Sequence, residues 1–161
     1  MSAANAFLLC ALALVLVAGL AVSETLSNYN YCDSTGKDEC EITNVQVIPC
    51  PEALTGEPCK VKRGTSATLS FDFTPHWASS GPLKTRAYWA HILDLPFVGM
   101  DTDACKYTSC PYVDGQKNSY NFTLELAKQY IAQRYDIKFR IWEEEAEPRK
   151  ECCLLFKLKL L

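Results

Sequence analysis

Histidine is the side chain best suited to acid–base chemistry at neutral pH, and the chain has only two, His76 and His91. His91 has Asp94 three residues further on, so a Ser-His-Asp arrangement could assemble around it in space. The chain contains neither a Gly-x-Ser-x-Gly turn nor a His-Glu-x-x-His pair. The sequence therefore predicts that the protein is not an enzyme, with His91 a structural strand residue and a secreted hydrolase as the alternative.

Clusters of carboxylates and thiols are the other groups that could do chemistry, as ligands of a metal ion. Glu143, Glu144 and Glu145 are consecutive, but a charged run of this kind is typical of a hairpin turn. Zinc could be imagined between cysteines 105, 110, 152 and 153, yet no histidine lies near them in the sequence. We expect no metal site and no cofactor.

The first 23 residues have the pattern of a secretory signal peptide. A short polar start, Met1 to Asn5, precedes the apolar stretch Ala6 to Val22, and Ala21-Val22-Ser23 offers small residues for cleavage after Ser23. An uncleaved anchor is the alternative, although an apolar run of about 17 residues is at the lower limit for a spanning helix. We expect residues 24–161 to form one domain that is secreted or delivered to lysosomes.

Eight cysteines remain after cleavage, because Cys10 of the nine lies in the signal segment. An even number of cysteines in a secreted chain predicts disulfides formed in an oxidising compartment. Spacing alone does not choose among their pairings. The net charge of −3 lacks the basic excess that binds nucleic acid.

Short segments of alternating polarity predict an all-β sandwich. Alternation of apolar with polar residues means that one face of each strand is buried. About seven strands fit the pattern, and a helix over residues 124–135 is the local alternative. The strands that we can place cover residues 42–48, 65–73, 83–95, 120–126, 135–141 and 156–160.

The surroundings of the cysteines resemble a known family. Val45 to Pro51, followed by Cys59 and Lys62-Arg63-Gly64, forms a first signature, and Cys105 to Gln116 forms a second. Together they resemble the ML lipid-recognition family, which includes Niemann–Pick type C2 sterol-transfer proteins and group 2 mite allergens. The resemblance implies an immunoglobulin-like sandwich of two sheets with an apolar cavity between them.

The resemblance also implies the disulfides. By analogy Cys50 pairs with Cys59, Cys105 with Cys110 and Cys32 with Cys153. Cys40 and Cys152 are additional to the six-cysteine pattern of the family, and we infer that they form a fourth bridge. Adjacent strand residues point to opposite faces, so we expect Cys153 to face inward and Cys152 outward. Exchange of Cys152 and Cys153 between the two partners is the alternative.

Ten side chains are predicted to contact a lipid. Inward aromatic residues of the strands are candidates for the cavity wall, although an aromatic residue in a sandwich is often only core filling. Apolar residues in loops need another explanation and are placed at the mouth. The wall candidates are Phe71, Phe73, Tyr120, Phe122 and Phe139, and the mouth candidates are Pro96, Phe97, Val98, Met100 and Tyr112.

The expected function is therefore binding and transfer of a sterol or another apolar lipid, without catalysis. A lipid-sensing module of innate immunity, or an extracellular carrier of fatty acids or chemical signals, is the alternative. Acceptor membranes or a receptor are the expected partners of a monomeric protein. The sequon Asn121-Phe122-Thr123 places a glycan on the polar face of its strand.

Overall fold

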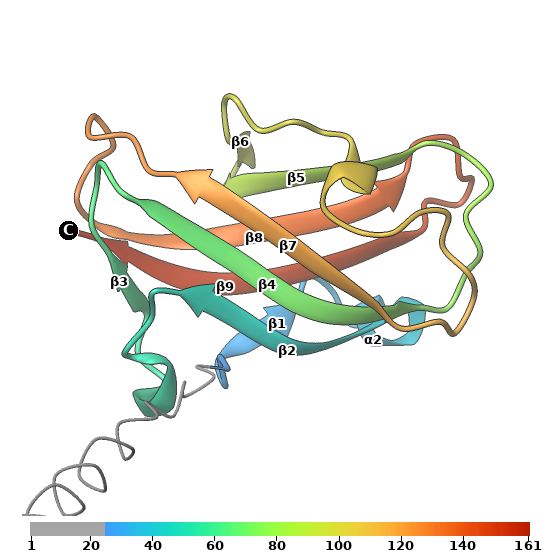
Figure 1. Cartoon of the computed structure of the whole chain (residues 1–161), viewed down its shortest axis with the longest axis horizontal. Coiled ribbons are helices and arrows are strands. Elements are labelled where there is room, and N and C mark those ends of the chain that lie inside the picture. The colour runs from blue at the N-terminus through green and yellow to red at the C-terminus, as the bar shows by residue number, and fades with distance from the viewer. Residues whose placement is uncertain (1–24) are drawn as a thin grey trace, which may run out of the picture.

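The computed structural model describes residues 25–161, and the predicted signal segment lies outside them. Two antiparallel layers face each other (Figure 1). The smaller sheet has the strand order β2-β4-β7, and the larger has the order β1-β9-β8-β5-β6 with β3 paired in parallel to β9. The elements are β1 Tyr29–Tyr31, α2 Gly36–Glu39, β2 Cys40–Ile48, β3 Cys59–Val61, β4 Ser66–Pro75, β5 Leu83–Ala90, β6 Leu95–Pro96, β7 Asn118–Glu125, β8 Arg134–Glu143 and β9 Glu151–Leu160. Short 3₁₀ turns occupy Ala53–Thr55 and Ala104–Lys106.

The predicted all-β sandwich is confirmed, and the alternation of the sequence explains its layers. In β4, residues 67, 69, 71 and 73 are buried, while the residues between them are partly exposed. β7 and β8 show the same period of two. Each sheet therefore turns one apolar face toward the other, which removes this surface from water and stabilises the fold. No helix within residues 25–161 is long and apolar enough to span a membrane.

Two local predictions, the end of one strand and the place of His91 within it, are wrong, and a third segment does not adopt the alternative considered for it. The strand expected over residues 83–95 stops at Ala90, because Ile92 and Leu93 turn out into solvent before the short β6 begins. His91 is consequently an exposed loop residue and not a strand residue. The helix considered for residues 124–135 is absent, since the backbone N–H and C=O of Leu126 pair with Thr65 and Gly64 of the β3–β4 connection.

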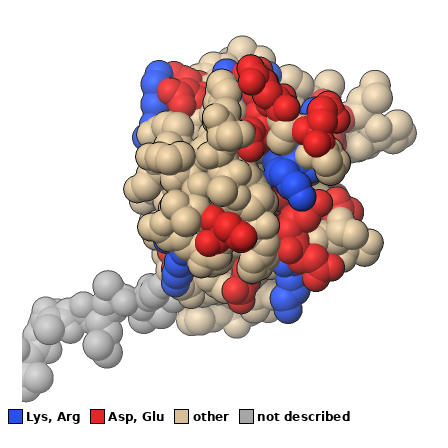
Figure 2. Space-filling view, turned by 90° about the vertical axis from the view of Figure 1, so that its right-hand side faces the viewer, with Lys and Arg blue, Asp and Glu red and all other residues tan. Residues whose placement is uncertain are grey.

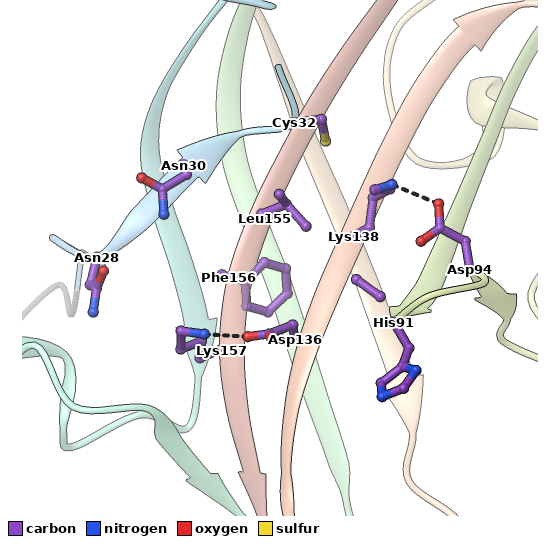
Figure 3. Close-up of a pocket in the computed structure, with 11 residues that line it drawn as sticks. Asn28, Asn30, Cys32, His91, Asp94, Asp136, Lys138, Leu155, Phe156 and Lys157 are labelled. Atoms are coloured by element: carbon purple, nitrogen blue, oxygen red, sulfur yellow. Dashed lines mark hydrogen bonds and ion pairs between the residues drawn. The ribbon is translucent and has the colours of Figure 1, made fainter. Parts of the chain in front are cut away.

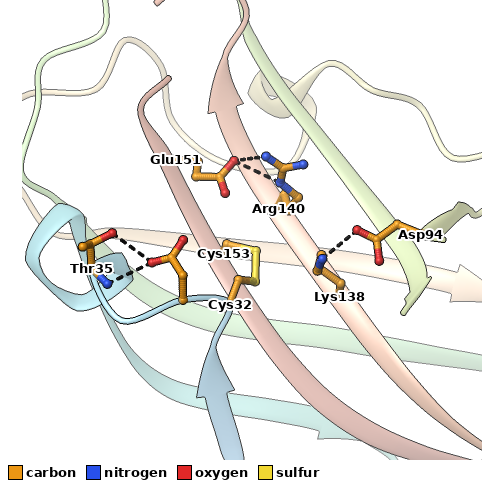
Figure 4. Close-up of a disulfide and its surroundings, with 8 residues drawn as sticks. Cys32, Thr35, Asp94, Lys138, Arg140, Glu151 and Cys153 are labelled. Carbon is orange, nitrogen blue, oxygen red and sulfur yellow. Dashed lines mark hydrogen bonds and ion pairs between the residues drawn. A yellow bond between two sulfur atoms is a disulfide. The ribbon is translucent and has the colours of Figure 1, made fainter. Parts of the chain in front are cut away.

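Four disulfides hold the sandwich. Three of them are the pairs that the resemblance implies, and the fourth, Cys40–Cys152, is the bridge inferred for the two additional cysteines. Cys32–Cys153 lies on the outer face of the large sheet, beside the Arg140–Glu151 ion pair (Figure 4). Cys40–Cys152 joins β2 to β9 and so connects the two sheets. Cys50–Cys59 connects the end of β2 to β3, and Cys105–Cys110 closes a loop between β6 and β7.

The expected orientation of the adjacent cysteines is wrong. Cys152 belongs to the inward row of β9 with Leu154, Phe156 and Leu158, and it joins the buried core. Cys153 shares the outer face with Leu155 and Lys157. The period of two decides this, because even-numbered positions face inward along β9.

Candidate functional site

An apolar cavity lies between the sheets, toward the end of the sandwich where β7 ends and β8 begins. Inward side chains of both sheets and of two connections surround it. The lining residues are Val47, Ala67, Leu69, Ala87, Phe97, Phe122, Leu124, Leu126, Ile137, Phe139, Phe156 and Leu158. Because all of these side chains are apolar, the cavity suits hydrocarbon and offers no partner to a charged group.

The cavity volume is about 30 Å³, enough for one or two water molecules. Sites for small organic ligands typically measure roughly 300–1,000 Å³. The sheets are therefore closed onto each other in this conformation, and a lipid can occupy the space only if they move apart.

Three of the ten predicted lipid contacts, Phe97, Phe122 and Phe139, line this cavity. Five others are buried outside the lining: residues 71, 73, 100, 112 and 120. Most of these five belong to an aromatic cluster that fills the opposite end of the sandwich. In it Phe71 stacks on Tyr120 with 5.2 Å between ring centroids, and Phe73 meets Tyr112 edge-on at the same distance.

The remaining two predicted contacts, Pro96 and Val98, point into solvent, and Val98 is 89% exposed. Consecutive residues of this apolar loop therefore lie in different environments. Phe97 turns inward and is 3% exposed, while its neighbours form an outer surface. Their contact with lipid remains a prediction.

Nine lining residues were not among the predicted contacts, and most of them are aliphatic members of the same alternating strands. The prediction named mainly aromatic side chains and therefore omitted these aliphatic residues. Their inward positions, such as residues 67 and 69 of β4 or 156 and 158 of β9, follow from the period of two. That signal was present in the sequence.

A second aromatic group closes the cavity from outside. The rings of Trp89 and Phe97 pack at a tilt with 4.1 Å between their centroids, and Trp89 also contacts Tyr130 at 5.3 Å and Tyr135 at 4.3 Å. A surface depression of about 460 Å³ lies on the other side of these rings, lined in part by Trp89, Tyr130 and Ile131. Phe97 and Trp89 thus separate this depression from the cavity.

Five exposed apolar side chains lie in the segments that line the depression or directly beside them, and we call them the apolar rim. They come from β6 and the residues just after it, and from the β5–β6 and β7–β8 connections. The apolar rim consists of Ile92, Leu93, Leu95, Val98 and Ile131, each more than half exposed. Groupings of exposed apolar side chains often mark contact surfaces in proteins.

A polar groove of about 410 Å³ crosses the outer face of the large sheet (Figure 3). Its charges are already paired, because Lys157 bonds Asp136 and Lys138 donates to Asp94 at 2.6 Å. His91 lies at its edge, and the carboxylate that a triad would require is held by Lys138 instead. No group of ligands able to hold a metal ion is found among residues 25–161.

The sequon asparagine is well placed for modification. Asn121 is exposed on the outer face of β7, and its side chain points away from the buried Phe122. Its backbone N–H donates to the Tyr107 carbonyl at 3.1 Å. A glycan there would extend into solvent from the small sheet.

Comparisons with known proteins agree with this architecture. A chain from Manduca sexta called MD-2-related lipid-recognition protein is 31% identical over 150 residues, covering 92% of this chain and 95% of that one. The ecdysteroid-regulated 16 kDa protein of the same species is 28% identical over 149 residues, with 91% and 97% coverage. The crystal structure of a Niemann-Pick type C2 protein from Japanese carpenter ant superposes with a TM-score of 0.69 at 19% identity, over 83% of this chain and 99% of that one, and shares the fold. The family model of the ML domain matches residues 27–160, so the chain belongs to the ML domain family.

Proposed function

We propose that this protein is a secreted carrier that holds a sterol or another apolar lipid between its two sheets and transfers it without catalysis. The observation that carries the proposal is the cavity between the sheets, lined only by apolar side chains and closed by Phe97 and Trp89. Membership of a lipid-recognition family supports lipid as the ligand. Four disulfides, together with the signal-like start, support folding in an oxidising compartment and export.

Native mass spectrometry of the secreted protein tests the binding directly. We expect an added mass that organic extraction removes, and renewed uptake of cholesterol or palmitic acid after extraction. Protein that is empty on secretion and takes up neither lipid contradicts the proposal. The same spectra report the expected cleavage after Ser23, the monomeric state and the glycan on Asn121.

The apolar rim supports delivery to membranes as the second half of the function. The five exposed apolar side chains lie in or beside the segments that line the depression outside Phe97, so a membrane that covers them would meet the closed mouth of the cavity. Val98→Asp should slow lipid transfer to acceptor vesicles about tenfold, because a charge in an apolar contact is costly. Val113→Asp is the matched control, since Val113 is also an exposed valine but adjoins the other aromatic cluster. Equal transfer by both variants would exclude the rim from delivery.

A receptor that recognises the loaded rim is the second candidate, because the same exposed surface lies beside the mouth. The two candidates differ in what removes the lipid. A carrier gives its lipid to protein-free vesicles, whereas a lipid-sensing module retains the lipid and binds its receptor only when loaded.

A further inference from the structure

Three buried polar atoms at the end of the sandwich away from the cavity have no hydrogen-bond partner. They are Nε1 of Trp77, Oγ1 of Thr108 and the hydroxyl of Tyr112. Trp77 and Tyr112 are 6% and 1% exposed, and their ring centroids lie 5.5 Å apart. Buried polar atoms are nearly always paired in folded proteins, so these atoms need a partner that the closed conformation does not supply.

The backbone holds these side chains in place. The Ser79 N–H donates to the Tyr112 carbonyl at 3.0 Å, and the Tyr112 N–H donates to the Ser79 hydroxyl at 2.7 Å. This double link fixes the segment after β4 against the segment after the Cys105–Cys110 bridge. Figure 2 looks onto this end of the molecule, where charged side chains of both signs cover much of the surface.

A neighbouring buried pair shows how the same kind of atom is otherwise satisfied. The hydroxyls of Thr85 and Tyr120 lie 3.0 Å apart, and Thr85 also donates to the Arg140 carbonyl at 3.1 Å. Because Thr85 has a single hydroxyl proton, Tyr120 must donate to Thr85. The hydroxyl protons of Thr85 and Tyr120 are therefore both hydrogen-bonded, whereas the Trp77 N–H and the Tyr112 hydroxyl have no acceptor.

The unpaired atoms lie in line with the cavity. The inward row of β4 runs from Ala67 and Leu69 in the cavity wall, through Phe71, to Phe73, whose ring meets Tyr112. Six residues of strand span roughly 20 Å. A rod-shaped lipid that enters past Phe97 and lies along the strands would bring its leading end to Tyr112 and Trp77.

The chemistry at this end selects a neutral oxygen. Burial raises the pKa of the Tyr112 hydroxyl well above its ordinary value, and no charged side chain contributes. The Thr108 hydroxyl lies near enough to lower this pKa in part, but the two hydroxyls do not have the geometry of a hydrogen bond. The Trp77 N–H can only donate, whereas the two hydroxyls can donate or accept. A hydroxyl or carbonyl fits these partners, but a carboxylate would be a buried charge without a cation.

We propose that Trp77, Thr108 and Tyr112 form a polar subsite at the closed end of the lipid path. The preferred ligand is then an amphiphile with an oxygen at both ends, such as a sterol hydroxylated on its side chain or an ω-hydroxy fatty acid. This inference rests on the proposed lipid binding between the sheets and specifies the class of lipid.

The test compares palmitic acid with ω-hydroxypalmitic acid, and cholesterol with a side-chain-hydroxylated cholesterol, on the delipidated protein. The unmodified protein should bind each hydroxylated lipid about tenfold more tightly. Tyr112→Phe should remove that preference, so that each hydroxylated lipid binds this variant no more tightly than its unmodified counterpart. Binding of each pair with equal affinity would overturn the polar subsite alone, whereas binding of none of the four lipids would overturn the proposed function itself.

Thermal unfolding of the lipid-free protein provides the second measurement. Tyr112→Phe should leave the Tm unchanged or raise it, because the hydroxyl that it removes has no partner. Tyr120→Phe is the matched control and should lower the Tm by roughly 3 °C, since it breaks a satisfied hydrogen bond. An equal loss in both variants would mean that a buried water already pairs with Tyr112, and would overturn the proposal.

Discussion

Asp72 is the most strongly bonded carboxylate on the outer face of the small sheet. It receives hydrogen bonds from Asn44 and Ser119, both at 2.7 Å, and an ion pair from Lys117 at 2.8 Å. These donors lower its pKa from 3.8 to about 2. Asn44 has a positive φ of 53° where the register of β2 shifts, so this carboxylate also secures an unusual backbone conformation.

The free energy of unfolding should therefore depend on this carboxylate in acid. Because its pKa is lower in the folded chain than in the unfolded chain, Asp72 stabilises the fold above pH 4 and loses this effect as the pH falls from about 4 to 2. We expect the free energy of unfolding to fall by about 1–2 kcal/mol over this interval. This is less than the pKa difference alone would give, because the side chain is partly exposed and solvent screens its charge. Denaturant unfolding at a series of pH values measures it, and Asp72→Asn should flatten the curve over that interval. If the free energy of unfolding falls equally steeply between pH 4 and 2 in both proteins, Asp72 is not the group responsible.

Phe97 and Val98 show what sequence patterns cannot resolve in a loop. Both belong to the same apolar run and both were predicted to contact lipid, yet one is buried against Trp89 and the other is almost fully exposed. In a strand the period of two assigns each residue to a face, but a loop has no fixed period. The packing that turns Phe97 inward, with its N–H donating to the Ala87 carbonyl at 3.0 Å, is a tertiary contact.

Substitution of these neighbours should separate their roles. Phe97→Ala should lower the free energy of unfolding by about 3 kcal/mol, because it removes a buried ring from the wall of the cavity. Val98→Ala should change it by less than about 0.5 kcal/mol, as is usual for exposed positions. Chemical denaturation checks both values, and a similar effect of the two substitutions would show that Phe97 does not pack in solution as it does here.

At the level of elements, β9 is held by two disulfides from consecutive residues. Cys32–Cys153 and Cys40–Cys152 close nearly the same long stretch of chain, with sequence separations of 121 and 112. Once one bridge is closed, the other constrains only the short loop of roughly 10 residues between them. In the chain-entropy model a short loop of that length is worth about 2.7 kcal/mol, and a loop of over 100 residues about 5 kcal/mol.

The two bridges should consequently be non-additive. Replacing either cysteine pair by alanine should cost about 2–3 kcal/mol, whereas replacing both should cost about 7–8 kcal/mol, more than the sum of the two. Urea unfolding of the two double variants and the quadruple variant measures this difference. Simple additivity would mean that the bridges act on the folded state and not through the unfolded chain.

The strands themselves were largely predictable, because alternation over β4, β7, β8 and β9 records which face is buried. The ends of strands were not. Nothing in residues 83–95 marks the exit at Ala90, since the chain remains apolar through Ile92, Leu93 and Leu95. For the cavity, alternation predicts inward positions but not the packing that leaves space beside Leu69 and fills the space beside Phe71. That difference depends on how side chains of both sheets interlock.

On the scale of the whole molecule, the covalent links between the sheets lie on one side. Cys40–Cys152 and Cys50–Cys59 both join β2, at the edge of the small sheet, to β9 and its neighbour β3. On the opposite side β7 faces β5, and no disulfide within residues 25–161 joins these two strands. Hydrogen bonds link them instead. The hydroxyls of Thr85 and Tyr120 pair directly, and the segment 102–107 bonds to Thr85 of β5 at one end and to Asn121 of β7 at the other. Because only the β2–β9 side is covalently linked, we expect the sandwich to open along its β5–β7 side.

This asymmetry matters because the closed cavity is far smaller than a lipid. Opening on the side without a disulfide would separate Ala87 of β5 from Phe122 of β7. These are the two strands nearest the mouth at Phe97. Hydrogen exchange with and without bound palmitic acid should then differ at the amides of β7, including the Asn121 N–H, by at least severalfold. The amides that pair β9 with β3, next to the Cys50–Cys59 bridge, should exchange at the same rate in both states. Equal changes on the two sides would show that the sheets separate as parallel plates, and the disulfides would then not define a hinge.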